Sequence, residues 1–155
     1  MAYMEKKQKL DNIVIEDAHI IFKNFSGVGN DYNKEGDRNF CVVISDQEWA
    51  NKLSEDGWNV KIRAPREEGD DPFIYIQVAV RFDKYPPKIV MVTNGNKVEL
   101  NEDTVGELDY ADIRSVDLEI NPSFWSRNGN SGIKAYLKTM YVTVEADRFA
   151  SKYDD

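Results

Sequence analysis

Hydrophobic and polar residues alternate with a period of two along several short stretches of this chain. In the clearest stretch, residues 73–82, every second position from Ile74 to Phe82 is apolar, and Tyr75 and Arg81 are among the residues between them. This alternation is typical of a β-strand with one face toward a protein core and the other toward solvent. We therefore predict a strand here, with Tyr75 and Arg81 on its outer face.

Further strands are predicted from runs of β-branched and aromatic residues. Residues 13–25 are expected to form one long first strand, with Ala18, Ile20 and Phe22 on the same face. Pro122 is expected to end the strand before it, because proline cannot donate a hydrogen bond within a sheet. The other predicted strands cover residues 38–44, 58–64, 88–93, 97–100, 116–120 and 133–144.

Turn and capping signals separate these strands. Ser45 and Glu48 have the spacing of a capping box for one short helix, which Gly57 can end in a left-handed conformation. Asn101 is expected to cap a second, shorter helix, and Asn94-Gly95 predicts a tight hairpin turn. Loops are predicted over residues 26–37, 65–72 and 123–131.

Many short strands with one or two small helices favour a mainly β protein, an OB-like antiparallel barrel with enlarged loops. A β-sandwich is the alternative. The 155 residues suit a single domain, which we place at residues 13–144, after a flexible N-terminal segment, 1–12. Residues 145–155 are expected to form a short acidic tail, with four acids and two bases.

Charge is distributed unevenly along the chain, whose formal net charge is −8. Residues 99–119 hold eight acids and one base, whereas residues 120–144 hold three bases and no acid. The net charge opposes contact with phosphates, which is made chiefly by lysine and arginine. The acid-free segment 120–144 nevertheless leaves one part of the chain open to such contact.

Residues for catalysis or metal binding are scarce. One histidine, His19, and one cysteine, Cys41, cannot build a zinc site, and Cys41 is expected to pack in the core. The acids of loop 65–72 lack the alternating pattern of a calcium loop, and neither a P-loop nor a dinucleotide fingerprint occurs. We therefore predict a non-enzymatic protein with no catalytic residue, no metal and no cofactor.

The last predicted strand combines bases with an aromatic ring. Alternation places Lys134, Tyr136 and Lys138 on one face, with the apolar residues between them pointing inward. Because the next apolar set begins at Met140, a β-bulge is expected near Lys138 or Thr139. The outer face is either an ordinary solvated surface or a place where a base stacks on Tyr136 between two phosphate contacts.

Bases and aromatics also recur together elsewhere, in the combination that single-strand binding requires. Trp58 and Trp125 are each either a core residue or a surface residue, since packing in the core also explains the presence of a tryptophan. The candidate nucleic-acid-binding residues are Lys61, Arg63, Arg66, Tyr75, Arg81, Lys84, Tyr85, Lys88, Trp125, Arg127, Lys134, Tyr136 and Lys138.

The order of several short motifs resembles phage-encoded single-stranded-DNA-binding proteins with an OB fold. The resemblance covers nearly the whole chain after residue 12. It is carried by residues 22–27 (FKNFSG), 38–40 (RNF), 56–61 (DGWNVK), 65–70 (PREEGD), 85–88 (YPPK) and 121–137, from Asn-Pro to the last strand.

The resemblance implies cooperative coating of single-stranded DNA during phage replication or recombination. It also implies an acidic tail that recruits replication or recombination enzymes, although the tail here carries a net charge of only −2. A homo-oligomer is possible within this function. Because no stretch approaches the eighteen apolar residues of a membrane helix, we expect a cytoplasmic protein, in the host cytoplasm if it is phage-encoded.

A rival function belongs to another class. The acidic segment 99–119 also suits a phage interaction protein that inhibits or occupies a host partner's nucleic-acid-binding groove.

Overall fold

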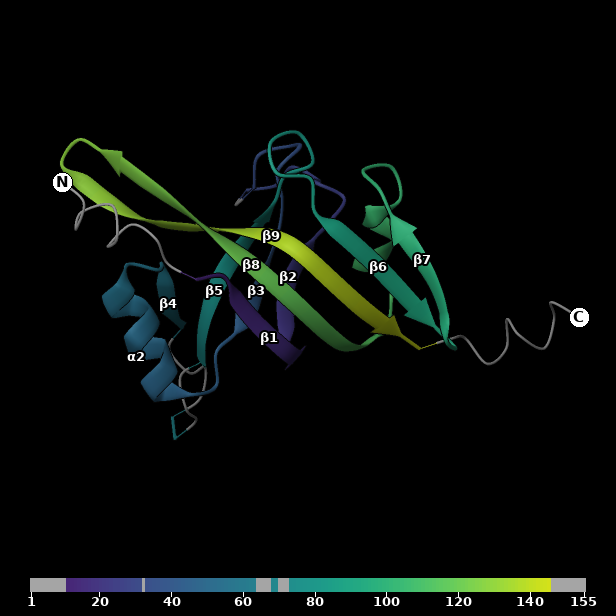
Figure 1. The fold of residues 1–155 in the computed structure, drawn as a ribbon, viewed down its shortest axis with the longest axis horizontal. Coiled ribbons are helices and arrows are strands. Elements are labelled where there is room, and N and C mark those ends of the chain that lie inside the picture. Colours follow the sequence, from purple (N-terminus) through teal and green to yellow (C-terminus); the bar gives the residue numbers. More distant parts are fainter. Residues whose placement is uncertain (1–10, 32, 64–67, 70–72, 146–155) are drawn as a thin grey trace, which may run out of the picture.

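In the part of the chain that the structure describes, nine strands form one sheet around a single core, with an α-helix at its side (Figure 1). The structure, a computed structural model, describes residues 11–31, 33–63, 68–69 and 73–145. In chain order the elements are β1 (Ile13–Ala18), β2 (Ile20–Asn24), β3 (Arg38–Val43), α2 (Gln47–Asp56), β4 (Val60–Arg63), β5 (Phe73–Val80), β6 (Lys88–Thr93), β7 (Asn96–Leu100), the 3-10 helix η1 (Val105–Asp109), β8 (Ile113–Arg127) and β9 (Asn130–Val144).

The strand order is β1-β8-β9-β5-β3-β2, with β4 added to β5, β6 to β9 and β7 to β6. The end strands β1 and β2 are not paired with each other, but only His19 separates them along the chain. The carbonyl of His19 accepts a hydrogen bond from Val43 N at 2.9 Å, so the chain bends there from one end of the sheet to the other. The fold is an OB-like, mainly β barrel that stays partly open, and the predicted fold class is confirmed.

The core lies inside this curved sheet. Phe25 and Phe40 stack with ring centroids 5.3 Å apart, and both are fully buried together with Ile120, Leu137 and Met140. The inner face of β5 supplies alternate residues from Ile74 to Val80, as its sequence pattern predicts. Helix α2 contributes Ala50 and Leu53, and the buried Trp58 follows it. Trp58 is thus a core residue.

The first strand differs from its prediction. Residues 13–25 form two strands instead of one, because the chain changes sheet partners at His19. Phe22 adopts a positive φ of 53° and is 51% exposed, whereas Ala18 and Ile20, expected on the same face, are partly buried against the core. The pattern fails because alternation holds only while the backbone remains extended.

The chain around residues 123–131 also differs. The predicted loop is instead the end of a long β8–β9 hairpin, closed by Asn128-Gly129 with positive φ values of 51° and 82°. Pro122 does not end β8; it pairs with Ala135 inside the ladder. The last pair between β1 and β8 is Ile13 with Ile120, so Pro122 lies on an unpaired edge where its missing N–H costs nothing.

The predicted bulge in the last strand is confirmed. Glu119 pairs with Thr139 and Ile120 pairs with Leu137, which leaves Lys138 as the extra residue on β9. The bulge shifts the inward register by one residue, so that Leu137 and Met140 are both buried.

Turns and caps largely follow the sequence. The N-cap of α2 is Asp46 and not Ser45, since the Asp46 carboxylate accepts hydrogen bonds from Glu48 N and Trp49 N. Gly57 ends the helix in the left-handed conformation, with φ at 108°, as predicted. The Asn94-Gly95 turn joins β6 to β7, and the side chain of Asn101 caps the turn before η1.

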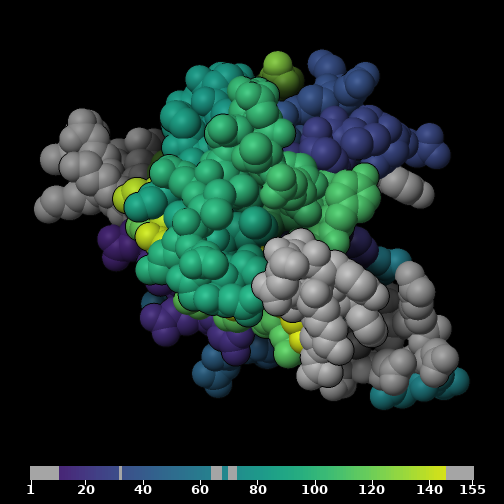
Figure 2. All heavy atoms as spheres, turned by 90° about the vertical axis from the view of Figure 1, so that its right-hand side faces the viewer, coloured from purple at the N-terminus to yellow at the C-terminus, as the bar shows by residue number. Residues whose placement is uncertain are grey.

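The end of the molecule opposite the tip of the β8–β9 hairpin is covered by β6, β7 and the turn after them (Figure 2). The loop before β3 lies beside this surface, where Ser26 is in contact with η1. Among the described residues there is no helix long and apolar enough to span a membrane.

The stacked phenylalanine pair leads to a stability prediction. Phe40→Ala should lower the free energy of unfolding by about 3–5 kcal/mol, because it leaves a cavity beside Phe25. Urea unfolding followed by circular dichroism measures this change. Val14→Ala removes an exposed strand residue and should shift stability by no more than about 0.5 kcal/mol. Equal losses for the two variants would contradict this placement of the core.

Candidate nucleic-acid interface

A groove runs over the outer face of β2, β3 and β5 toward the β8–β9 hairpin. It consists of a wide part of about 1040 Å³ and a narrow part of about 420 Å³, which share Asn33, Asn39 and Gln77. The wide part borders β4 and η1, and the narrow part borders β9. We call these two adjoining parts the groove.

The floor of the groove comes directly from the alternation of β5. Because Ile74, Ile76 and Val78 fill the core, Tyr75, Gln77 and Ala79 face outward. Their β3 partners are Val43, Cys41 and Asn39, respectively. Ala79 and Ala135 keep the floor of the narrow part low, since neither side chain reaches far from the sheet.

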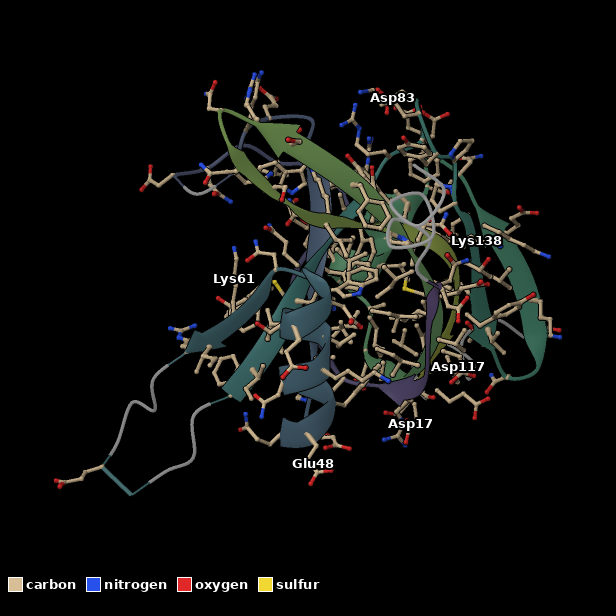
Figure 3. The ribbon with its side chains drawn as sticks, turned by 60° about the vertical axis from the view of Figure 1, so that its left-hand side comes forward. Asp17, Glu48, Lys61, Asp83, Asp117 and Lys138 are labelled. Atoms are coloured by element: carbon tan, nitrogen blue, oxygen red, sulfur yellow. The ribbon has the colours of Figure 1, made fainter. Side chains whose placement is uncertain are left out.

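An aromatic cluster with one cation forms a wall of the wide part. Phe22 meets Tyr75 edge to face at 6.0 Å, and Phe73 lies 5.8 Å from Tyr75. The Arg63 guanidinium lies 5.5 Å from the Phe22 ring centroid and 5.8 Å from that of Phe73. Lys61 projects from the neighbouring part of β4, opposite Tyr75 (Figure 3). Flat rings and cations are thus adjacent on this wall.

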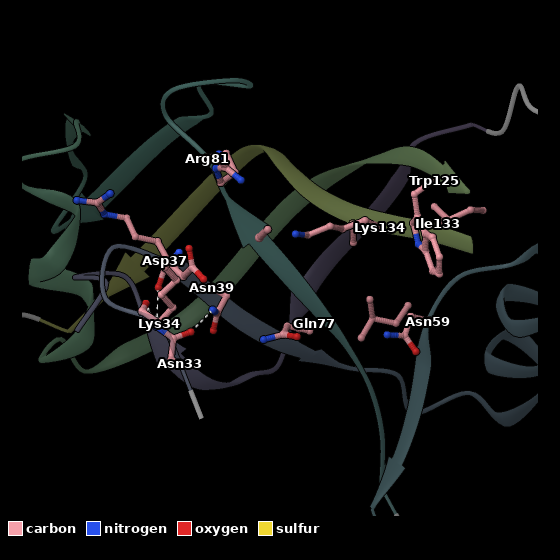
Figure 4. A pocket seen from close by; sticks show the side chains of 14 residues that line it. Asn33, Lys34, Asp37, Asn39, Asn59, Gln77, Arg81, Trp125, Ile133 and Lys134 are labelled. Carbon is pink, nitrogen blue, oxygen red and sulfur yellow. Dashed lines mark hydrogen bonds between the residues drawn. The ribbon is translucent and has the colours of Figure 1, made fainter. Parts of the chain in front are cut away.

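The β8–β9 hairpin brings a second aromatic side chain to the narrow part. Trp125 is 46% exposed and pairs with Gly132, where an added Cβ would lie 3.1 Å from the indole ring. Glycine therefore leaves the space in which the indole lies. Figure 4 shows Trp125 and Ile133 at one end of this part, Arg81 and Asp37 at the other, and Lys134 between them.

The groove is positively charged, although the chain is acidic. Among the described residues, seven cations and two carboxylates line its two parts, a net of +5 in a chain of −8. The cations are Lys23, Lys34, Arg38, Lys61, Arg63, Arg81 and Lys134, and the acids are Asp37 and Asp109. Polar residues without charge, chiefly asparagine and glutamine, make up much of the remaining lining.

Three of these cations form hydrogen bonds or ion pairs with other described residues. Lys23 Nζ donates to the Leu108 carbonyl at 3.0 Å, and Arg38 lies 3.6 Å from a carboxylate oxygen of Glu102. Arg81 donates from Nε and from a terminal nitrogen to the two carboxylate oxygens of Asp83, at 3.0 and 2.9 Å. This hydrogen bonding holds the pKa of Asp83 at about 2 and raises the pKa of Arg81.

One of the two acids in the groove has a structural role. Asp109 accepts hydrogen bonds from Phe25 N at 2.7 Å, Ser26 N at 3.0 Å and the Ser26 hydroxyl. These bonds attach the start of loop 26–37 to the end of η1. They position the loop that carries Asn33 into the groove, where Asn33 accepts a hydrogen bond from Asn39 at 2.7 Å (Figure 4).

Cys41 lies in the floor of the wide part. Burial raises the pKa of its thiol to about 11, although the charge of Lys61 opposes the shift. The thiol is therefore protonated near neutral pH, which suits a packing role. Among the residues that the structure describes, there is no group of three or more histidine, cysteine or acidic side chains placed to hold a metal ion.

Residues 2–155 match the family described as "Putative phage ssDNA-binding domain". The chain belongs to this family. Its fold is similar to that of a single-stranded DNA-binding protein from bacteriophage Enc34, whose structure in complex with ssDNA has a TM-score of 0.58 and 12% identity and covers 89% of each chain. The same phage protein in a separate structure has a TM-score of 0.56 and 10% identity, over 93% of this chain and 87% of that one. No curated protein matches the sequence.

The groove unites six of the thirteen residues predicted from the sequence of this family member. Lys61, Arg63 and Tyr75 line its wide part, and Arg81, Trp125 and Lys134 line its narrow part. Trp125, left open between core and surface, is a surface residue.

The other predicted residues lie elsewhere. Arg127 is exposed at the tip of the hairpin, and Lys138 lies 3.6 Å from the Glu119 carboxylate. Lys84 and Tyr85 belong to the turn after β5, and Lys88 is exposed at the start of β6. Arg66 lies outside the described residues, as do most of the segment 1–12, most of the loop 65–72 and nearly all of the tail 145–155.

Tyr136 requires a correction. Its ring was expected to be open to a base, but it is only 9% exposed because Tyr85 lies 4.9 Å away, centroid to centroid. The amino group of Lys134 lies 5.3 Å from the same ring. Alternation alone could not show that a turn from another part of the chain covers this face.

Sequence reasoning also missed groove residues. Phe22 was not among the predicted binding residues, yet its positive φ turns it toward Tyr75 and Arg63. Asn33 and Asn39 carry no periodic signal, and the alternation of β5 places Gln77 outward without marking it as a binding residue. Only the pairing of β3 with β5 brings Asn39 and Gln77 together. The motif FKNFSG, residues 22–27, was the one available signal for Phe22.

The Trp125–Gly132 contact can be tested directly. In Gly132→Ala the new methyl group needs the space of the indole, so Trp125 should move outward and become more accessible to solvent. Acrylamide quenching of tryptophan fluorescence should increase relative to the parent protein. The increase should vanish when Trp125→Phe is added, because the atoms nearest the new methyl group belong to Trp125 and not to Trp49 or Trp58. An increase that persists in the double variant would contradict the contact.

Proposed function

We propose that this protein binds single-stranded DNA along the groove, with little dependence on sequence. Bases stack on Phe22, Tyr75 and Trp125, while phosphates contact the groove's cations. The observation that carries this proposal is the net charge of +5 in an aromatic-walled groove of a chain that is otherwise acidic. Membership of the phage ssDNA-binding family supports the same ligand.

The choice of a single strand follows from the rings. A base can stack on a protein side chain only when its own faces are free, and in a duplex the neighbouring base pairs cover them. Stacking is tolerant of sequence because every base has a flat face, and phosphate contacts carry no sequence information. The bacteriophage Enc34 protein of similar fold is itself found in complex with ssDNA.

We also propose a biological setting for this binding. We infer that the protein coats single strands during phage DNA replication or recombination, in the host cytoplasm and without catalysing a reaction. We also propose that the domain spans residues 13–144 and that the tail 145–155 recruits phage enzymes. A homo-oligomer on DNA is a further part of this proposal. The family description supports the binding of single-stranded DNA, which each of these proposals requires.

The rival function, binding of a host protein through the acidic segment 99–119, has less support. Four of its eight acids are engaged within the molecule. Glu102 pairs with Arg38, Glu119 pairs with Lys138, and Asp109 holds the chain at Ser26. Asp117 accepts a hydrogen bond from Asp17 N at 2.8 Å, and Figure 3 shows these two acids side by side. These acids stabilise the fold and are less available to a partner.

Titration of fluorescent oligothymidylate tests the groove. Tyr75→Ala and Trp125→Ala should each weaken binding by roughly 1–3 kcal/mol, the usual loss for one stacked base. Tyr141→Ala is the matched control, since Tyr141 is a partly exposed tyrosine on β9 that does not line the groove. Higher salt should weaken binding sharply because phosphate contacts release counterions. Equal affinity for a duplex of the same sequence would reject single-strand binding.

The Arg81–Asp83 pair leads to the prediction of a variant that binds single-stranded DNA more tightly. Asp83 occupies the two nitrogen donors with which Arg81 would hold a phosphate, so an incoming phosphate must displace it. Asp83→Asn should therefore tighten binding by roughly 2- to 5-fold, the scale of an exposed ion pair.

Two variants separate this competition from a general effect of charge. Glu48→Gln removes the same unit of charge on α2, far from Asp83 (Figure 3), and should leave the affinity nearly unchanged. In an Arg81→Gln background, Asp83→Asn should lose its effect. Weaker binding by Asp83→Asn alone would mean that Asp83 orients Arg81 and does not compete with the phosphate.

A further inference from the structure

A second hollow lies on the β8 side of the β8–β9 hairpin, outside the groove. Its volume is about 400 Å³, near the lower end of the range for small-molecule sites. It is lined by Asn12, Tyr85, Asn121, Pro122, Ser123, Phe124 and Tyr136. We call this the second hollow.

Exposed aromatic rings form much of the second hollow. Phe124 is 42% exposed and Tyr85 is 46% exposed, while the buried ring of Tyr136 lies behind Tyr85. Two large exposed rings beside one hollow are costly to leave in water, and such patches usually mark contact with a ligand or partner. Asn12, Asn121 and Ser123 add hydrogen-bonding groups at the same place.

Charge favours an anionic occupant. No acid is among the described residues that line the second hollow, and five of these seven residues belong to the acid-free segment 120–144. Lys84, which precedes Tyr85 in the chain, is exposed, and the amino group of Lys134 lies 5.3 Å from the Tyr136 ring centroid. The Glu119 carboxylate, which accepts a hydrogen bond from Asn12 at 2.8 Å, is offset by Lys138 at 3.6 Å.

The second hollow is continuous with the groove through one residue. Lys134 lines the narrow part of the groove and also lies over Tyr136, which lines the second hollow. Across the hairpin, Lys134 pairs with Ser123 and Tyr136 pairs with Asn121, and paired residues share a face of the ladder. This face of the hairpin leads from the groove to the second hollow, where it meets Phe124, which pairs with Ile133 and projects from the opposite face of β8.

We propose that the second hollow is a further nucleobase site, which receives a base from the same DNA strand after that strand crosses the hairpin at Lys134. The base stacks on Phe124 or Tyr85, and Lys134 and Lys84 contact the phosphates on either side. This inference rests on the proposed function, because it extends the path of the strand beyond the groove. It makes the hairpin a part of the protein that DNA crosses and not merely the border of the groove.

The length of the oligonucleotide separates the two sites. Affinity is measured for oligothymidylates of increasing length, first with the parent protein and then with Phe124→Ala. Short oligonucleotides that fill only the groove should bind the variant as well as the parent. Longer ones should lose roughly 5- to 150-fold in affinity, the equivalent of one lost stacked base. Tyr141→Ala should leave affinity unchanged at every length.

A second measurement does not depend on variants that could perturb the fold. Oligothymidylates with 5-iodouracil at single positions are crosslinked to the parent protein by light, and the attachment sites are identified by mass spectrometry. Crosslinks to Phe124 or Tyr85 should form only from positions near one end of a long oligonucleotide. Crosslinks to Tyr75 and Trp125 should form from the other positions.

The outcomes distinguish failure of this inference from failure of the proposed function. If Phe124→Ala leaves all lengths unchanged and no crosslink reaches Phe124 or Tyr85, the second hollow is not a base site and is free to bind an aromatic side chain of a protein. If Phe124→Ala weakens short and long oligonucleotides equally, the two sites are not separate and the inference is wrong. If the parent protein binds no single strand at any length, the proposed function itself fails.

Discussion

The fold depends on the way strand β9 changes partners along its length. Its first half pairs with β5 at Ala135 and Tyr136, its second half pairs with β6 from Thr139 onward, and β8 covers its other edge throughout. The bulge at Lys138 lies between the two halves. It adds a local bend and keeps both Leu137 and Met140 in the core, so one strand serves two parts of a curved sheet. The groove and the hairpin take their positions from this strand.

Charge in this protein is arranged by the tertiary structure as much as by composition. Several acids of segment 99–119 are used as local anchors, such as Asp109 at the start of loop 26–37. The cations of the groove instead come from strands and loops far apart in sequence, including Lys61 and Lys134. An acidic protein can therefore present a basic groove, and the net charge of the chain is a poor guide to its ligand.

Sequence reasoning performed best where neighbouring residues decide the structure. The alternation of β5, the Asn94-Gly95 turn and the bulge at Lys138 were all predicted correctly, because each depends on a few adjacent residues. It failed at His19, where the predicted single strand divides in two, and at Pro122, which does not end its strand. At both positions a neighbouring strand, or the lack of one, decides which backbone and side-chain orientation is stable.

The sequence by itself determined the β-rich class, the outward position of Tyr75 and the segment 120–144 without acids. Periodicity and composition are local properties that survive in any compact arrangement of the chain. Only the tertiary structure decided that Phe22 and Arg63 stand together, that Trp125 lies across Gly132, and that Tyr85 covers Tyr136. These contacts join residues from strands and turns that are separate along the chain. Their geometry is set by strand pairing and close packing, which no single segment contains.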